Sequence, residues 1–170
     1  MASSYLSKTP ASATNRRTFT ISFWLKTSVA TGDYTLFYSA GSGSHEFKIA
    51  FDTSERLYVY DFNGTSFDIL LKTNRVFRDT SAFYNIVYEI DTTNATADDR
   101  IKLYVNGVQE TSFSDRTNPS QNHDTEWNGT GVHYIGRDGS GSYIDGILTH
   151  IHNIDGLAYD ADTFGETDAT

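Results

Sequence analysis

Apolar and polar residues alternate along most of the chain, and this alternation restricts the fold more than any other feature. In segment 18–26, polar residues separate most of the apolar positions Phe19, Ile21, Phe23 and Leu25. A repeat of two places alternate side chains on opposite faces of a β-strand, whereas an amphipathic helix repeats every about 3.6 residues. Further segments with strand character are 33–39, 46–51, 56–62, 65–71, 82–91, 101–105, 108–113, 132–135 and 143–154, with an edge strand or lead-in at 7–14 and a helical turn at 161–164.

Two Asn-Gly pairs indicate how neighbouring strands are joined. Each pair stands between two of these segments, at Asn63-Gly64 and Asn106-Gly107. Asn-Gly readily adopts the positive φ values of a tight hairpin turn, so each pair of flanking segments is predicted to be an antiparallel hairpin. A series of short strands without helices packs as two antiparallel sheets. We therefore predict an all-β fold, a two-sheet antiparallel β-sandwich of the jelly-roll type.

Size, charge and residue usage exclude several classes of protein. The 170 residues are the length of one domain, so we expect a single domain over 1–170. A formal net charge of −9 argues against binding to a phosphate backbone or an anionic membrane surface. The absence of Cys excludes disulfides and thiolate metal sites. The longest apolar runs, such as Phe23-Trp24-Leu25, are far shorter than the about 18 residues of a membrane span.

Four strand blocks resemble a known group of jelly rolls. These blocks are TFTISFWLK at 18–26, RIKLYVNG at 100–107, YIGR at 134–137 and YIDG at 143–146. In order and spacing they resemble the laminin-G-like and pentraxin-like domains of the concanavalin A-like lectin and glucanase superfamily. This resemblance implies the same jelly roll over nearly the whole chain, with a role in glycan binding or in assembly.

Shorter segments resemble a narrower group. Segments 5–10, 76–82, 154–158 and 164–168 are similar to the laminin-G-like domains of structural proteins from marine bacteriophages. In that group such a domain is usually one module of a longer virion, tail or fibre protein. The resemblance implies that this chain is a virion module, displayed on the virion surface.

A long polar stretch, 114–131, holds the residue types that sugar binding requires. A sugar offers an apolar face ringed by hydroxyls, so its site combines an aromatic platform with polar groups. The predicted sugar-binding residues are Asp124, Glu126, Trp127 and Asn128, with Tyr143 expected at the same end of the sandwich. The alternative for Trp127 is a core position, because Trp prefers to bury its large area.

A calcium site is implied by the resemblance to pentraxin-like and laminin-G-like folds, which often hold calcium with loop oxygens. Calcium takes about 6–8 oxygen ligands. Loop 136–140 stands at the place of a pentraxin ligand loop, which makes Asp138 the best candidate ligand. The opposing loop, 41–46, offers only Glu46. A solvated Asp-Gly turn is the alternative for Asp138.

A second metal hypothesis concerns histidines. His150 and His152 lie two apart on a predicted strand and therefore share a face, an arrangement that can hold zinc or copper. A third ligand from His123 or His133 is conceivable, but the sequence does not place either one nearby. Two exposed histidines are the simpler interpretation.

A hydrolase motif is present only in part. Glu89-Ile90-Asp91 resembles the Glu-x-Asp-x-Glu strand of the retaining β-glucanases, in which two glutamates are the nucleophile and the acid/base. Here the closing position is Thr93, or Asn94 if a bulge intervenes. Neither side chain can protonate a leaving group, so we do not expect an enzyme.

The other aromatic residues favour structural roles. Trp24 is interpreted as structural. Tyr58, Tyr60 and Phe62 alternate on one strand face, which is compatible with a ligand platform or a subunit contact, but a core or half-covered sheet face explains them more simply.

The sequence thus favours a non-catalytic phage virion module that binds glycan on the host cell surface. Its expected partners are bacterial surface polysaccharide or other virion proteins. The alternative is a structural module that decorates the virion or oligomerises a fibre through an apolar patch, and a weaker alternative is a glycoside hydrolase. A lectin should expose Trp127 or Tyr143 beside Asp138, whereas a structural module should bury its aromatic rows against a neighbour.

Overall fold

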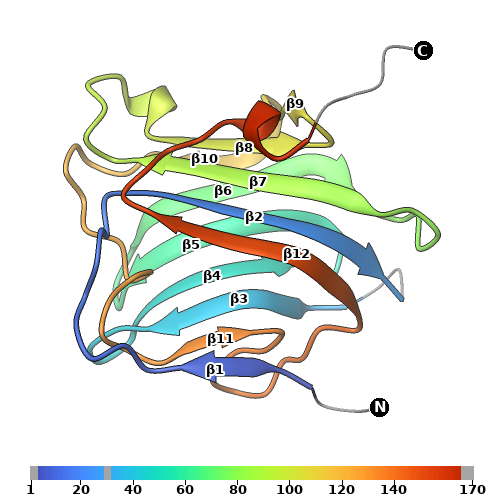
Figure 1. The fold of residues 1–170 in the computed structure, drawn as a ribbon, viewed down its shortest axis with the longest axis horizontal. Coiled ribbons are helices and arrows are strands. Elements are labelled where there is room, and N and C mark those ends of the chain that lie inside the picture. The colour runs from blue at the N-terminus through green and yellow to red at the C-terminus, as the bar shows by residue number, and fades with distance from the viewer. Residues whose placement is uncertain (1–3, 29–31, 166–170) are drawn as a thin grey trace.

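The computed structural model describes residues 4–28 and 32–165 and shows two antiparallel sheets packed face to face (Figure 1). The seven-stranded sheet has the order β1-β11-β3-β4-β5-β6-β10, and the five-stranded sheet has the order β12-β2-β7-β8-β9. The strands are β1 (Leu6–Lys8), β2 (Thr18–Thr27), β3 (Tyr34–Ala40), β4 (His45–Phe51), β5 (Arg56–Asn63), β6 (Phe67–Val76), β7 (Tyr84–Asp91), β8 (Ile101–Val105), β9 (Val108–Gln109), β10 (Phe113–Thr117), β11 (His133–Ile135) and β12 (Gly146–Asp155). The prediction of an all-β jelly-roll sandwich is confirmed.

Both Asn-Gly hairpins form. Gly64 turns the chain between β5 and β6 with a φ of 85°, and Asn106 and Gly107 join β8 to β9 with φ values of 51° and 80°. The second hairpin is shorter than predicted, because β9 ends at Gln109. The chain then crosses to the other sheet, where β10 pairs with β6. An ion pair of 2.7 Å between Arg75 and Glu110 ties this crossover to β6.

The core lies between the sheets and is built from aromatic, β-branched and leucine side chains. The four apolar residues of β2 are fully buried, which confirms the alternation in that strand. Ile86, Tyr88 and Ile90 of β7 are also fully buried. Rings from the two sheets meet, with the centroids of Phe23 and Phe37 4.8 Å apart.

The outer face of the five-stranded sheet is covered in part by the C-terminal segment (Figure 1). Thr20 Oγ1 donates to the carbonyl of Leu157 and accepts from the amide of Tyr159, at 2.9 and 2.8 Å. The 3-10 turn η2 (Ala161–Thr163) follows, as predicted; a second such turn, η1 (Ala97–Asp99), precedes β8. On this face of β7, Glu89 and Asp91 are half-buried, whereas Val87 is fully buried.

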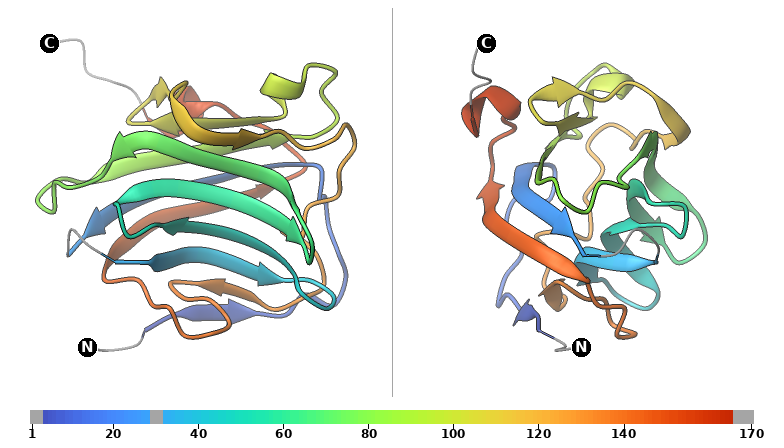
Figure 2. Two further views of the ribbon diagram at one scale, coloured as in Figure 1. Left: turned by 180° about the vertical axis from the view of Figure 1, so that it is seen from behind. Right: turned by 90° about the vertical axis from the view of Figure 1, so that its right-hand side faces the viewer.

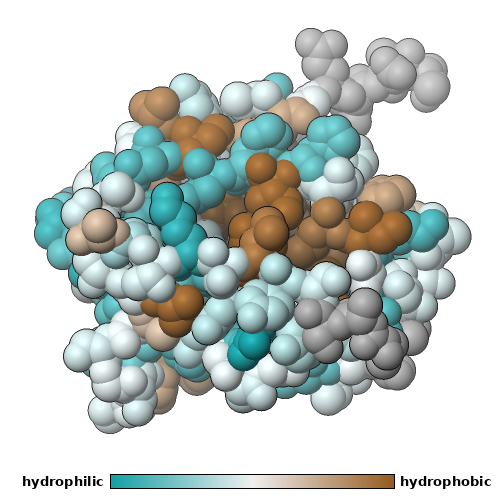
Figure 3. All heavy atoms as spheres, turned by 60° about the horizontal axis from the view of Figure 1, so that its bottom comes forward, coloured by the Kyte–Doolittle hydropathy of each residue, from teal (hydrophilic) through white to brown (hydrophobic). Residues whose placement is uncertain are grey.

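The two sheets do not cover each other at one edge. The two views in Figure 2 show β11 and β1 extending beyond β12, the last strand of the five-stranded sheet. Apolar side chains gather in a hollow along this edge (Figure 3), where Leu6 and Ile135 line a cavity of about 280 Å³. We call this region the open edge. Within 4–28 and 32–165, no helix has the length and apolarity that crossing a membrane requires.

Candidate functional site

The structure divides the predicted site residues between two places. Asp124, Trp127 and Asn128 lie in the loop between β10 and β11, at one end of the sandwich. Tyr143 and Asp138 lie in the loop between β11 and β12. Glu46 is on β4 of the seven-stranded sheet. The predicted site residues therefore do not come together in one site.

Trp127 is a core residue, so its use as a sugar platform is a correction to the sequence prediction. Its side chain is 3% exposed and packs against the rings of Phe37, Phe47 and His133, with centroids 5.9, 5.5 and 4.7 Å away. The indole Nε1 donates to Asn153 Oδ1 at 3.1 Å. The ring closes one end of the core, which was the alternative for this residue, and a sugar cannot stack on it.

Asn128 and Asp124 hold the same loop against the start of β2. Asn128 is 7% exposed with a φ of 61°, and its Nδ2 donates to the carbonyl of Asn15 at 2.9 Å. Asp124 accepts from Arg17 Nε at 2.7 Å. The Arg17 hydrogen bond lowers the pKa of Asp124. Both side chains thus have partners within the protein, and neither is placed beside a free aromatic platform.

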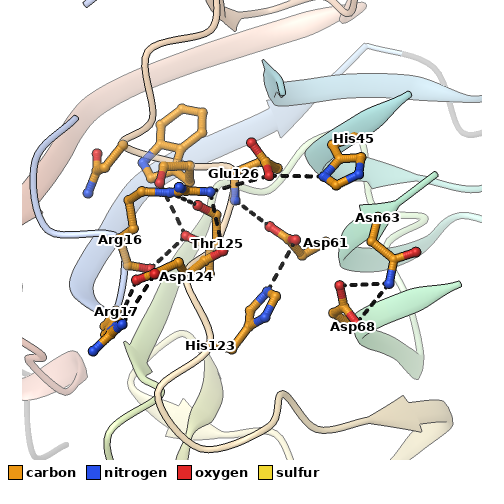
Figure 4. A network of polar contacts seen from close by, with 12 residues as sticks. Arg16, Arg17, His45, Asp61, Asn63, Asp68, His123, Asp124, Thr125 and Glu126 are labelled. Carbon is orange, nitrogen blue, oxygen red and sulfur yellow. Dashed lines mark hydrogen bonds and ion pairs between the residues drawn. The ribbon is translucent and has the colours of Figure 1, made fainter. Parts of the chain in front are cut away.

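A polar network beneath this loop was not predicted (Figure 4). Asp61 of β5 is 2% exposed, accepts from the backbone amide of Glu126 at 2.7 Å and lies 3.3 Å from His123 Nε2. The Glu126 carboxylate lies 3.3 Å from Arg16 and from His45. Burial raises the pKa of Asp61. This network ties the loop to β4, β5 and the start of β2.

Asp61, Asp68 and His123 place their ligating atoms within 4.8 Å of one another, an arrangement that can hold a metal ion. No other such group is present in 4–28 and 32–165. Both oxygens of Asp68 lie 3.0 Å from Asn63 Nδ2, and both oxygens of Asp61 accept hydrogen bonds. The group is therefore best described as a hydrogen-bonded anchor for the loop.

The contribution of His123 to stability should depend on pH. Burial lowers the pKa of His123, but the hydrogen bond and charge of Asp61 outweigh it and leave the pKa above 6.5. The stabilisation by His123 is therefore complete below the pKa of His123 in the unfolded chain. It is lost as the pH rises through the higher pKa of His123 in the folded protein. We expect the free energy of unfolding, measured with urea, to fall more steeply above pH 6.5 in the wild type than in His123→Gln. Equal slopes would contradict this assignment.

Asp138 is buried and saturated with hydrogen bonds. Its Oδ1 accepts from the amides of Ser140, Gly141 and Ser142 and from the Ser140 hydroxyl, at 2.8–3.0 Å. Its Oδ2 accepts from Lys48 Nζ at 3.0 Å and from the Thr35 hydroxyl at 3.2 Å. Burial raises its pKa, but these hydrogen bonds outweigh burial and hold the pKa well below its usual range.

These contacts do not fit the calcium ion that the resemblance implies. The Lys48 ammonium already neutralises the Asp138 carboxylate, and six donors use its two oxygens. Glu46, the other candidate ligand, accepts a hydrogen bond from the Tyr60 hydroxyl.

The outer face of the seven-stranded sheet and its margin gather six tyrosine rings, of which Tyr5 is exposed and the others are half-buried. We call the following set the tyrosine face: Tyr5, Tyr38, Tyr58, Tyr60, Tyr134 and Tyr143. Strand register brings part of the tyrosine face together. Tyr134 of β11 is opposite Tyr38 of β3, and Tyr38 is opposite Lys48 of β4. Lys48 is in turn opposite Tyr60 of β5. Tyr58 stacks on Tyr60 at 5.9 Å, and Tyr38 stacks on Tyr134 at 6.2 Å.

Charged groups are held among these rings. The Arg137 guanidinium lies 4.8, 4.7 and 5.3 Å from the ring centroids of Tyr5, Tyr134 and Tyr143, within cation–π range. Asp138, the residue after Arg137, forms a buried ion pair with Lys48 of β4. Aromatic rings, hydroxyls and fixed charges thus occupy one surface of the molecule.

Three tyrosine hydroxyls on this face, those of Tyr38, Tyr58 and Tyr60, have raised pKa values and stay protonated at neutral pH. Burial and the neighbouring Glu46 carboxylate raise the pKa of Tyr38 to about 12. Burial also raises the pKa values of Tyr58 and Tyr60, together with hydrogen bonds to Asp33 and Glu46. The hydroxyls of Tyr58 and Tyr60 donate to the carboxylates of Asp33 and Glu46 and keep lone pairs that can accept from a ligand hydroxyl.

Only part of this surface was predicted from the sequence. Tyr143, Asp138 and Glu46 were candidate site residues, whereas the alternation of Tyr58 and Tyr60 favoured a core or half-covered position. Tyr38, Tyr134, Arg137 and Lys48 were missed. The alternation of residues in β5 was the local signal for this surface. The residues that lie beside β5 on neighbouring strands depend on strand register, which no local pattern predicts.

The other two chemical hypotheses gain no support from the geometry. Glu89 accepts from Lys102 Nζ and from the Tyr104 hydroxyl, at 3.2 and 2.7 Å. Asp91 accepts from Thr93 in a turn. His150 and His152 both line a hollow beside Trp24, but in the described ranges no third His, Asp or Glu forms a metal-ligating group with them.

The fold and the sequence agree with a known family. The family model described as the concanavalin A-like lectin/glucanases superfamily matches residues 2–155. The chain belongs to this superfamily. No curated protein matches the sequence.

Solved structures of the superfamily resemble this chain in fold. The mouse laminin α1 chain, domains LG4-5, superposes with a TM-score of 0.64 at 14% identity, over 94% of this chain and 41% of that one. The heptameric SAP-like pentraxin of Limulus polyphemus gives 0.58 at 14% identity, over 88% and 68%. The CBM40 domain of a Ruminococcus gnavus sialidase, bound to α2,3-sialyllactose, gives 0.60 at 14% identity, over 93% and 95%. The chain spans about two fifths of the laminin fragment.

Proposed function

We propose that this domain is a non-catalytic glycan-binding module and that the tyrosine face is its binding surface. The observation that supports this most is the cluster of six tyrosines on and beside the outer face of one sheet, with the Arg137 guanidinium held among three of the rings. A pyranose ring can stack on the exposed edges and faces of such rings while its hydroxyls bond to the tyrosine hydroxyls.

The relatives support this class of ligand. The CBM40 domain that shares the fold is bound to sialyllactose. The exposed ring of Tyr5 and the half-buried rings of Tyr134 and Tyr143 surround Arg137, which supplies donors beside the aromatic surface. A lectin was predicted to expose Trp127 or Tyr143 beside Asp138, but Trp127 and Asp138 are buried and Tyr143 is half-buried.

A glycan array tests this proposal. The purified domain, applied once with calcium and once with a chelator, is expected to bind the same polysaccharides in both conditions, because no calcium ligand set forms at Asp138. Failure to bind any glycan would contradict the proposed function. Binding that disappears with the chelator would contradict the assignment of Asp138 to an ion pair with Lys48.

Tyr134→Ala is expected to weaken binding to a glycan from that array by about 10-fold or more, because it removes the ring that stacks on Tyr38 and Arg137. Tyr134→Phe should retain most of the affinity if stacking dominates. Tyr159→Ala is the matched control, since Tyr159 is 36% exposed and follows β12 instead of lying on the tyrosine face. Titration calorimetry measures all three. Equal losses for Tyr134→Ala and Tyr159→Ala would argue against this surface.

A second function, assembly through the open edge, is favoured by one observation. Leu6 of the edge strand β1 is 64% exposed, and Tyr5, which precedes this strand, is 45% exposed. An uncovered edge strand with apolar side chains is a site of self-association. The related Limulus pentraxin is heptameric. Light scattering that shows an oligomer in the wild type and a monomer in Leu6→Lys would support this function; an unchanged mass would contradict it.

We further propose that the module belongs to a phage virion protein and is displayed on the virion surface, where bacterial polysaccharide is its partner. The resemblance of segments 5–10, 76–82, 154–158 and 164–168 to phage structural domains supports this setting. Peptides of this chain should be found by mass spectrometry in purified virions. Their absence would contradict the setting and leave the glycan site untouched.

A further inference from the structure

The hydrogen-bonded anchor beneath the loop between β10 and β11 also has the composition of a metal site (Figure 4). Asp61 comes from β5, Asp68 from β6 and His123 from the loop, so the group joins the loop to a hairpin distant in sequence. One ligating atom of each side chain lies within 4.8 Å of those of the other two. One imidazole nitrogen and two carboxylate oxygens suit zinc, whereas calcium and magnesium take oxygen ligands.

The separation of Asp61 and His123 matches that of two ligands on one ion. Asp61 Oδ1 lies 3.3 Å from His123 Nε2. A charge-assisted hydrogen bond from nitrogen to a carboxylate oxygen is usually about 2.7–2.9 Å long. Zinc with bonds of about 2.0–2.1 Å and tetrahedral geometry separates two ligand atoms by about 3.3 Å. These two atoms therefore already stand at the separation that a shared zinc ion requires.

The charges of the group are also those that a divalent cation balances. Asp61 is 2% exposed, and its partners are the Glu126 amide and His123. Both oxygens of Asp68 lie 3.0 Å from the neutral side-chain amide of Asn63. Among the described residues, neither carboxylate forms an ion pair with Lys or Arg. Buried charges in proteins are normally paired or coordinate a metal, and one zinc ion neutralises two carboxylates.

The group can take up an ion from solvent without rebuilding its surroundings. Asp61 is buried, whereas Asp68 and His123 are half-buried and give the ion a path from solvent. Each carboxylate oxygen has two lone pairs, one for its present donor and one for the ion. A zinc-bound imidazole is neutral, so the ion replaces the proton between His123 and Asp61.

We propose that Asp61, Asp68 and His123 bind one zinc ion. The ion fastens the loop between β10 and β11 to the β5–β6 hairpin, and it thereby supports Trp127, which closes one end of the core. Three protein ligands leave the fourth position of the zinc to a water molecule. The site does not depend on glycan binding by the tyrosine face.

Titration calorimetry of the whole domain, treated with chelator and then dialysed, tests the site. One equivalent of zinc chloride is expected to bind. The midpoint of thermal unfolding should rise with zinc concentration, since only the folded protein brings the three ligands together. Calcium chloride and magnesium chloride at the same concentrations should have neither effect. No binding of zinc, or equal binding of calcium, would overturn the proposal.

Variants assign the bound zinc to these side chains. Asp68→Asn keeps the size of a half-buried residue and should weaken zinc binding by about 10-fold or more, and His123→Gln should do the same. The double variant His150→Gln with His152→Gln is the matched control, because it removes the pair of histidines beside Trp24. It should bind zinc as the wild type does. Circular dichroism verifies that each variant is folded. Unchanged binding in Asp68→Asn and His123→Gln, or an equal loss in the control, would overturn the assignment.

Discussion

Asp138→Ala is expected to destabilise the domain by about 3–5 kcal/mol, because it leaves the buried Lys48 ammonium without its counter-charge. Lys48 is 9% exposed and has the Asp138 carboxylate at 3.0 Å. The substitution also frees the amides of Ser140, Gly141 and Ser142, which now share one carboxylate oxygen. Urea unfolding measures the loss. If Asp138 were instead part of a solvated Asp-Gly turn, Asp138→Ala would change the free energy of unfolding little.

Asp115→Ala is the matched control for this substitution. Asp115 lies on β10 of the seven-stranded sheet, which also contains Lys48. Its half-exposed carboxylate is 3.9 Å from the Lys72 ammonium. Exposed ion pairs contribute about 0–1 kcal/mol, so its loss should be small. The double variant Lys48→Ala with Asp138→Ala should cost less than the sum of the two single variants, since no unpaired charge remains. Strict additivity would contradict direct coupling between Lys48 and Asp138.

Trp127→Ala is expected to cost about 3–5 kcal/mol of stability, the range for a large aromatic side chain removed from a packed core. The ring contacts Phe37, Phe47 and His133, and its loss opens a cavity at the end of the sandwich. It also leaves Asn153 without the indole donor. Thermal and urea unfolding are the measurements.

Trp24→Ala is the matched control, because it removes the same side chain from an exposed position. Trp24 is 36% exposed, against 3% for Trp127. We expect a loss of about 1 kcal/mol or less for Trp24→Ala. Similar losses for the two variants would mean that Trp127 is not a core residue, and the sugar-platform hypothesis for it would regain its basis.

The sheets were predictable because local sequence determines them. The alternation in β2 places four apolar residues on one face, and burial of that face follows from the hydrophobic effect. The Asn-Gly turns fix two hairpins through backbone conformation at Asn106 and the two glycines. Both signals involve only a few neighbouring residues, so they can be recognised from the sequence alone.

The candidate site was less predictable because it depends on contacts distant in sequence. In β5, alternation separates Tyr58 and Tyr60 from Val59 and Asp61, and either set can be taken as the inward one. The structure buries Asp61 because His123 and the Glu126 amide, both from a distant loop, bond to it. Asp61 thus takes an inward position that its polarity argues against, and the tyrosines are left on the outer face.

Trp127 shows the same limit in a loop. Its neighbours in sequence are polar, and no periodicity indicates the direction of its side chain. The positive φ of Asn128 and the anchor at Asp61 direct the loop so that the indole enters the core. The joining of Tyr38 to Tyr134 likewise requires β11 to pair with β3, which no local pattern encodes.

The most direct test of the central claim is an NMR titration of the domain, selectively labelled on its tyrosine rings, with a glycan found by the array. The shifts should change in the tyrosine face: Tyr5, Tyr38, Tyr58, Tyr60, Tyr134 and Tyr143. Tyr88 should not respond, since it is fully buried, and neither should Tyr159. Binding that leaves all six resonances unchanged would contradict the assignment of glycan recognition to this face.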